Sequence, residues 1–210
     1  MSKFFVVFDV DSTLIEDEVI ELLAEVAGRR AEVAAVTERA MAGELDFAAS
    51  LIERVATLEG LPESVFADVL QKVTVTTGAA ELIHRIHEAG GRVGAVSGGF
   101  TQVLTPLADR LGLDFARANE LEVVDGKLTG KVLGQIVDKT VKAQSLLEWA
   151  ERIGFSQAQT VAVGDGANDL EMMSWAGLSV AFNAKPIVKA SADIVLQNNN
   201  LEELADLLGV

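Results

Sequence analysis

The chain contains no cysteine among its 210 residues. Disulfide bonds, thiol nucleophiles and zinc sites built on cysteine are therefore excluded. Proline is scarce, with 3 residues, and 50% of the residues are hydrophobic. This composition excludes a largely disordered chain and favours one folded domain, or one domain with an insertion.

Positive charge is also in short supply. The sequence has 17 lysine and arginine residues against 32 aspartate and glutamate residues, a formal net charge of -15. Such a charge repels nucleic acids and acidic membrane surfaces, so we expect neither as a partner. A small anionic substrate is still compatible with this charge, provided that local cations offset the overall field.

The N-terminal region has no long apolar run. Its first run, residues 4–8, is too short for the core of a signal peptide and far too short to cross a bilayer. We therefore expect a soluble, cytoplasmic protein, and the sequence leaves both a monomer and a homodimer open.

Short apolar segments alternate with helical patterns along most of the chain. The strand patterns lie at residues 3–10, 92–96, 160–163, 178–181 and 193–196. The helical patterns lie at residues 79–88, 101–111, 140–153, 169–176 and 200–208. This alternation predicts an α/β fold with a doubly wound parallel sheet, which binds ligands beyond the carboxyl ends of its strands.

Two segments interrupt the alternation. Residues 17–75 contain three or four amphipathic helical stretches and no convincing strand. We interpret them as a small helical cap domain inserted after the first strand, with residues 1–16 and 76–210 forming the core domain. Residues 121–132 carry Asp125-Gly126 between alternating residues, which predicts a hairpin with a type I′ turn, a small antiparallel appendage.

Two aspartates, Asp9 and Asp11, stand at the end of the first predicted strand. Residues two apart in a strand point the same way, so both carboxyl groups are expected to face one site. Two close carboxylates repel, and one acquires a raised pKa. One can then act as an ionised nucleophile and the other as a proton carrier, although a plain turn would also explain the motif.

A second acidic motif, GDGAND, follows the predicted strand at residues 160–163. The carboxylate of Asp165 is a hard oxygen ligand that suits Mg²⁺. Asn168 and Asp169 are placed to support such a metal site from behind. A glycine-rich turn with an aspartate N-cap is the alternative interpretation.

A third motif, Ser97-Gly98-Gly99, follows the predicted strand at residues 92–96. A hydroxyl and uncovered backbone N–H groups before a helix make an anion cradle, although glycine-rich turns are common. Because all three motifs end parallel strands, the fold is expected to bring a nucleophile, a metal site and a phosphate cradle to one edge.

In this order, DVDST, SGG and GDGAND resemble the signature of the haloacid dehalogenase superfamily. That signature also has a lysine between the second and third motifs. Lys142 fits it, within the stretch DKTVKAQSL, and Lys139 is a nearby alternative. The resemblance implies a Rossmann-like core.

Over its whole length, the chain resembles the phosphoserine phosphatase family within that superfamily. The stretches that carry this resemblance are DVDSTLIEDE, MAGELDFAASLIER, VSGGF and VAVGDGAND. It implies that Glu18 holds the substrate ammonium, that Arg54 grips its carboxylate, and that Met41 and Phe47 line the pocket. As alternatives, Glu18 is a first-turn helix acid and Arg54 pairs with a surface acid.

The resemblance further implies an Mg²⁺-dependent phosphatase, which hydrolyses O-phospho-L-serine in the last step of serine biosynthesis. Mg²⁺ would be held by Asp9, Asp165 and the backbone carbonyl of Asp11, with Asp169 in support. The residues implied to bind the substrate phosphate are Ser97, Gly98, Lys142 and Asn168.

Three alternatives stay open. The substrate could be phosphothreonine or another phosphomonoester, or the enzyme could transfer the phosphoryl group of phosphoserine to another acceptor alcohol. The chain could also be a non-catalytic binding protein or a receiver-like regulatory domain. Receiver domains also place Asp and Lys around a doubly wound sheet, although they are shorter and lack a helical cap. His84 and His87 are three residues apart on a predicted helix and could share a metal, but an exposed helical pair is the expected interpretation.

Overall fold

The computed structural model describes residues 3–41 and 44–210, the side chains of residues 40 and 41 excepted. Seven strands form one sheet in the order β4-β3-β2-β1-β5-β6-β7. Every neighbouring pair is parallel except β3 and β4. The strands are β1 (Phe5–Phe8), β2 (Arg92–Phe100), β3 (Phe115–Val124), β4 (Lys127–Leu133), β5 (Thr160–Gly164), β6 (Leu178–Ala181) and β7 (Ile194–Val195).

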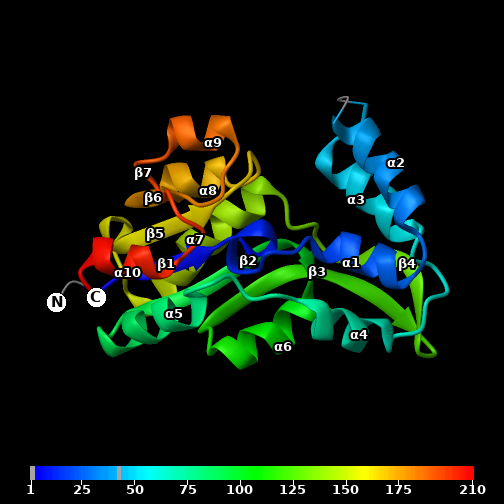
Figure 1. Ribbon diagram of the computed structural model, residues 1–210, viewed down its shortest axis with the longest axis horizontal. Helices are drawn as coiled ribbons and strands as arrows, with labels where there is room; N and C mark the ends of the chain where they lie inside the picture. Colours follow the sequence, from blue (N-terminus) through cyan, green and yellow to red (C-terminus); the bar gives the residue numbers. More distant parts are fainter. Residues whose placement is uncertain (1–2, 42–43) are drawn as a thin grey trace.

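Helices cover both faces of the sheet (Figure 1), as the doubly wound prediction requires. The described helices are α1 (Val19–Val26), α2 (Arg30–Met41), α3 (Phe47–Ala56), α4 (Val65–Lys72), α5 (Ala79–Glu88), α6 (Thr101–Leu111), α7 (Lys139–Ile153), α8 (Leu170–Trp175), α9 (Pro186–Ser191) and α10 (Glu202–Leu208). None of the helices in the described ranges is long and apolar enough to span a membrane.

The central strand β1 is apolar on both faces because it is buried on both. Val6 and Phe8 join the core cluster that includes residues of α5, α6 and α10. Phe5 and Val7 join the other cluster, with residues of α7, α8 and α9. All four are fully buried, which explains the continuous apolar run that marks a buried parallel strand.

The segment between β1 and β2 is helical, as predicted, and contains α1 to α4. The two chain segments that join it to the sheet run side by side. Ile15 forms an antiparallel bridge with Val75, and the Glu16 N–H donates to the Thr74 carbonyl at 2.9 Å. This short ladder lies at the two ends of the predicted cap, residues 17–75. The division of the chain into a core domain and a cap domain is still our interpretation.

The predicted hairpin forms, but it is not an appendage. Asp125 and Gly126 have φ angles of 50° and 72°, as a type I′ turn requires. Strand β3 pairs in parallel with β2 and thereby adds both hairpin strands to the main sheet. The hairpin also supports the helical segment, because the Gly60 N–H donates to the Leu128 carbonyl at 2.8 Å.

Strand β2 is longer than predicted. It continues through Ser97, Gly98 and Gly99 to Phe100, and its register with β3 shifts after Val96. Glycine is depleted in strands, so the sequence pattern predicted that this strand ends at residue 96. The third motif is therefore the irregular carboxyl end of an internal strand, directly before α6.

Candidate active site

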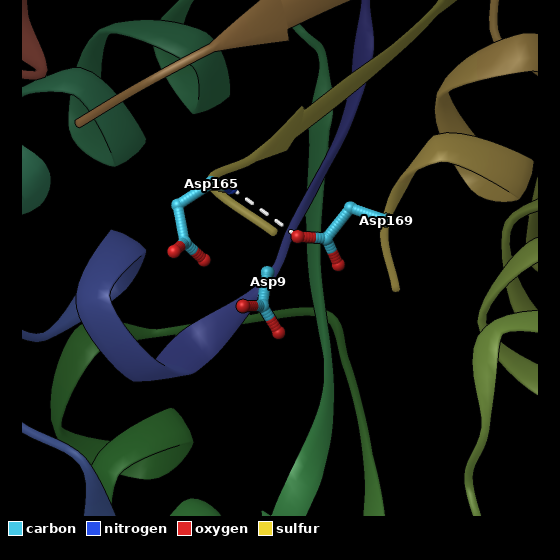
Figure 2. Close-up of side chains that lie close together, drawn as sticks. All are labelled: Asp9, Asp165 and Asp169. Carbon is cyan, nitrogen blue, oxygen red and sulfur yellow. Dashed lines mark hydrogen bonds between the residues drawn. The ribbon is translucent and has the colours of Figure 1, made fainter. Parts of the chain in front are cut away.

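The two aspartate motifs meet where the strand order reverses. Asp9 follows β1 and Asp165 follows β5, and the Asp9 N–H donates to the Val163 carbonyl at 2.9 Å. Ligand sites of doubly wound sheets form at such a switch point. One carboxylate oxygen each from Asp9, Asp165 and Asp169 lie within 4.8 Å of one another. Figure 2 shows these side chains, with Asp169 approaching from the start of α8.

Lys142 links this cluster to helix α7. Its ammonium donates to Oδ1 of Asp9 at 2.5 Å and to Oδ1 of Asp169 at 2.7 Å. Burial alone would lower the pKa of Lys142, but the two carboxylates outweigh burial and raise it. Lys142 is 1% exposed, whereas Lys139 is exposed one turn earlier. Of the two lysines considered, Lys142 is the one at the cluster.

Asp169 supports its neighbours. One of its oxygens accepts from Lys142. The other accepts from the backbone N–H groups of Asp165 and Gly166, at 3.2 and 3.0 Å, and the first of these bonds is dashed in Figure 2. A fully buried carboxylate with three donors holds the turn after β5 in place.

The cluster carries excess negative charge. Burial, followed by the Asp169 carboxylate, raises the pKa of Asp9 despite the opposing effect of Lys142. The same two causes raise the pKa of Asp165 to about 6. The cluster has three carboxylates against the single ammonium of Lys142, so a cation bound beside them would lower these pKa values. Clustered carboxylate oxygens fit the preference of Mg²⁺ for hard oxygen ligands.

Asp11 stands beside the cluster in a different environment. Its Oδ2 accepts from the Val19 N–H at 3.3 Å, while its buried Oδ1 has no partner among the described residues. Burial, and then the charge of Glu18, raises the pKa of Asp11 to about 7. With this pKa, Asp11 can carry a proton at neutral pH.

The Ser97-Gly98-Gly99 segment forms a tight, nearly buried edge of the site. The Ser97 hydroxyl accepts from the Gly99 N–H at 2.7 Å. A Cβ on Gly99 would lie 3.0 Å from the Ser97 Oγ, and a Cβ on Gly98 would lie 2.9 Å from the ring of Phe47. A side chain on Gly98 would displace the ring of Phe47, and one on Gly99 would crowd the Ser97 hydroxyl, so glycine fits this backbone best.

Asn119, which the sequence analysis missed, fixes this segment. Its amide nitrogen donates to the carbonyls of Gly98 and Gly99 at 2.8 and 3.2 Å, and its oxygen accepts from the Val137 N–H at 2.8 Å. Asn119 is 1% exposed. It joins the glycine segment to the chain that enters α7, the helix that carries Lys142.

A pocket of about 200 Å³ lies over these groups. This is smaller than the roughly 300–1,000 Å³ of sites for drug-sized ligands, and it suits a small metabolite. Its described lining includes nine of the predicted residues: Asp9, Asp11, Glu18, Phe47, Arg54, Ser97, Gly98, Asp165 and Asn168. Lys142 and Asp169 lie outside this lining.

The helical segment supplies one wall of this pocket. Glu18 accepts from the Ser12 hydroxyl at 2.8 Å. The Nε of Arg54 donates to the Ser50 carbonyl at 3.2 Å, and no ion pair of Arg54 is formed within residues 3–41 and 44–210. The side chain of Met41 lies outside the described residues. Ile20, Leu51 and Lys185 also line the pocket and were not predicted.

The two histidines do not form a site. His84 approaches Glu88 at 3.4 Å and His87 approaches Asp114 at 2.8 Å, each with its own carboxylate partner. The expected interpretation of these residues as a surface pair on α5 agrees with these separate contacts.

Comparisons with known proteins agree with this geometry. Residues 6–174 match the family model of haloacid dehalogenase-like hydrolases. The chain is 50% identical over 206 residues to a phosphoserine phosphatase of Streptococcus thermophilus, covering 98% of this chain and 96% of that protein. It is 53% identical to one of Mycobacterium tuberculosis, covering 100% of this chain but only 51% of that longer protein.

A solved structure supports the same relationship. The fold matches a substrate-bound phosphoserine phosphatase with a TM-score of 0.91 and 42% identity, over 99% of both chains. A phospho-aspartyl intermediate analogue of a phosphoserine phosphatase matches with the same TM-score and identity.

Proposed function

The chain belongs to the haloacid dehalogenase-like hydrolases and, within them, to the phosphoserine phosphatases, and on this premise we propose that it hydrolyses O-phospho-L-serine to L-serine and phosphate. The observation that carries the proposal is the meeting of Asp9 and Asp11 with Glu18 and Arg54 in one small pocket. The first pair suits phosphoryl transfer, and the second suits the ammonium and carboxylate of an amino acid.

The first step forms an aspartyl-phosphate. A carboxylate oxygen of Asp9 attacks phosphorus in line, and the bond between phosphorus and the serine oxygen breaks. Asp11, with its pKa of about 7, gives its proton to the leaving oxygen. The neighbouring ammonium of Lys142 orients the attacking carboxylate of Asp9.

The second step returns the enzyme to its starting state. Asp11, now ionised, takes a proton from water, and the water oxygen bonds to phosphorus. The bond between phosphorus and Asp9 breaks, which releases phosphate. Positioning and charge stabilisation supply most of the rate gain in such transfers, here with the Ser97–Gly99 segment held by Asn119.

Mg²⁺ fits the acidic cluster. Asp9, Asp165 and the backbone carbonyl of Asp11 would hold it, with Asp169 and Asn168 in support. When bound, it would neutralise charge on the phosphoryl oxygens and on the carboxylates of the cluster.

Arg54 is expected to select for a substrate carboxylate. Arg54→Ala should reduce kcat/KM for phosphoserine by roughly 10²-fold or more, because the substrate carboxylate loses its bidentate guanidinium partner. An aryl phosphate without a carboxylate should lose less than about threefold. Parallel kcat/KM measurements on both substrates check this, and equal losses would remove Arg54 from substrate recognition.

The raised pKa of Asp11 predicts a pH dependence. Because the leaving oxygen needs the Asp11 proton, kcat/KM should fall about tenfold per pH unit above about pH 7. Glu18→Gln removes a charge that raises this pKa, so the descending limb should move to lower pH. A pH profile of both proteins tests this. A limb that stays in place in Glu18→Gln would contradict the assignment of that limb to Asp11.

A further inference from the structure

The pocket wall is poor in uncommitted positive charge. Four carboxylates line it, those of Asp9, Asp11, Glu18 and Asp165. The described basic residues of the lining are Arg54 and Lys185. The chain as a whole carries a formal charge of -15. A phosphate monoester, which is a dianion, must approach against this field.

Lys142 is not accessible to an anion that is still in solvent. It is 1% exposed and its ammonium already contacts two carboxylates, those of Asp9 and Asp169. Arg54, which lies on the helical segment, is assigned under our proposed function to the substrate carboxylate. A Mg²⁺ ion held by the acidic cluster would neutralise a phosphate group that is already in the pocket. A residue that attracts the phosphate beforehand therefore has to be a solvent-exposed cation of the pocket wall.

Lys185 occupies such a position. It immediately precedes α9, and its backbone N–H donates to the carbonyl of Asp165 at 2.9 Å. This bond ties the base of the side chain to the loop of the acidic cluster. The residue is exposed, and no salt bridge involves it in the part of the chain that the structure describes.

Lys185 is also accessible from solvent on a second side. It lines a further polar hollow of about 400 Å³, together with Ser12, Glu16, Thr76, Asp165, Asn183 and Asn199. Lys185 and Asp165 are the two residues shared by this hollow and the main pocket. A flexible ammonium at this junction can meet an anion in solvent and still reach the pocket.

We propose that Lys185 is the residue that captures the substrate phosphate, drawing the phosphomonoester dianion from solvent into the pocket. This inference rests on the proposed function for the nature of the ligand. Lysine suits the task because its ammonium is a compact, mobile point charge. Its effect acts on encounter and binding, and the chemical step is left to Asp9 and Asp11.

The matched variants are Lys185→Gln and Lys189→Gln. Both residues are exposed, they are four positions apart, and both changes remove one positive charge next to or within α9. Only Lys185 lines the pocket. Unfolding temperatures should stay close to that of the unmodified protein, because surface substitutions usually change stability by less than about 0.5 kcal/mol.

The kinetic measurement is kcat/KM for phosphoserine at increasing salt. At low salt, Lys185→Gln should lower kcat/KM roughly tenfold with kcat within about twofold, and the loss should shrink as salt screens the charge. Lys189→Gln should match the unmodified protein, and Lys185→Arg should recover most of the loss. Equal effects of Lys185→Gln and Lys189→Gln would overturn the proposal, because only overall charge would then matter.

Titration calorimetry with inorganic phosphate, at saturating Mg²⁺, separates this inference from the choice of substrate. Weaker phosphate binding in Lys185→Gln, with unchanged Mg²⁺ affinity, supports capture even if phosphoserine proves not to be the substrate. Unchanged phosphate binding overturns it. Tighter Mg²⁺ binding with unchanged phosphate affinity also overturns it, because Lys185 would then only balance the charge of Asp165.

Discussion

Asp9→Asn is expected to reduce phosphate release by roughly 10⁴-fold or more while the protein stays folded. The amide cannot form the aspartyl-phosphate, so the first step is lost. Folding should survive because asparagine has nearly the same shape and is neutral, and burial already disfavours the charged form of Asp9. Phosphate release and thermal unfolding, measured on the same preparation, check both parts of this expectation.

The matched control is Asp125→Asn in the turn between β3 and β4. Asp125 is exposed and has a φ angle of 50°, a conformation that asparagine tolerates. Its activity should equal that of the unmodified protein. Turnover by Asp9→Asn within tenfold of the unmodified rate would rule out Asp9 as the nucleophile.

Lys142→Met is expected to cost about 3–5 kcal/mol of unfolding free energy at neutral pH, and to abolish activity. The change leaves the carboxylates of Asp9 and Asp169 buried without their ammonium partner. Methionine keeps the length and much of the volume of the side chain, so a cavity contributes little. Urea unfolding without Mg²⁺ measures the loss.

The dependence of that loss on pH follows from its cause. Without Lys142, the pKa of Asp9 in the folded state rises further above its unfolded value. The resulting penalty is absent below the unfolded pKa and grows as pH rises toward the folded pKa. Lys142→Met should therefore be less destabilised near about pH 5 than near about pH 8. Lys139→Met, exposed on the same helix, should show neither effect, and a similar loss in both would contradict the buried ion cluster.

Sequence patterns were sufficient to predict an element where its residue types follow directly from local burial. The apolar run of β1, buried on both faces, marked the central strand, and the residues after β1 and β5 could be placed at one edge by parallel topology alone. Lys142 could be placed by family resemblance, and the structure brings it to Asp9. The location of the site at the carboxyl edge of the sheet could therefore be predicted without knowing any side-chain contact.

Sequence patterns failed to predict an element where its polar residues form hydrogen bonds with residues far away in the sequence. Strand β3 contains Arg117 and Asn119, which break its apolar pattern, and the first half of the strand was not predicted. Arg117 donates to Ser145 of α7, and Asn119 donates to the carbonyls of Gly98 and Gly99. Lys185 was missed because its place beside Asp165 depends on a loop contact between segments 20 residues apart.

The most direct test is phosphate release from L-phosphoserine, with and without Mg²⁺, beside phosphothreonine and an aryl phosphate. We expect Mg²⁺-dependent release that strongly favours phosphoserine, because Glu18 and Arg54 share the pocket with Asp9 and Asp11. Release from the aryl phosphate alone would retain the Asp9 chemistry and contradict the assignment of Glu18 and Arg54. No release from any of the three would contradict the proposed activity itself.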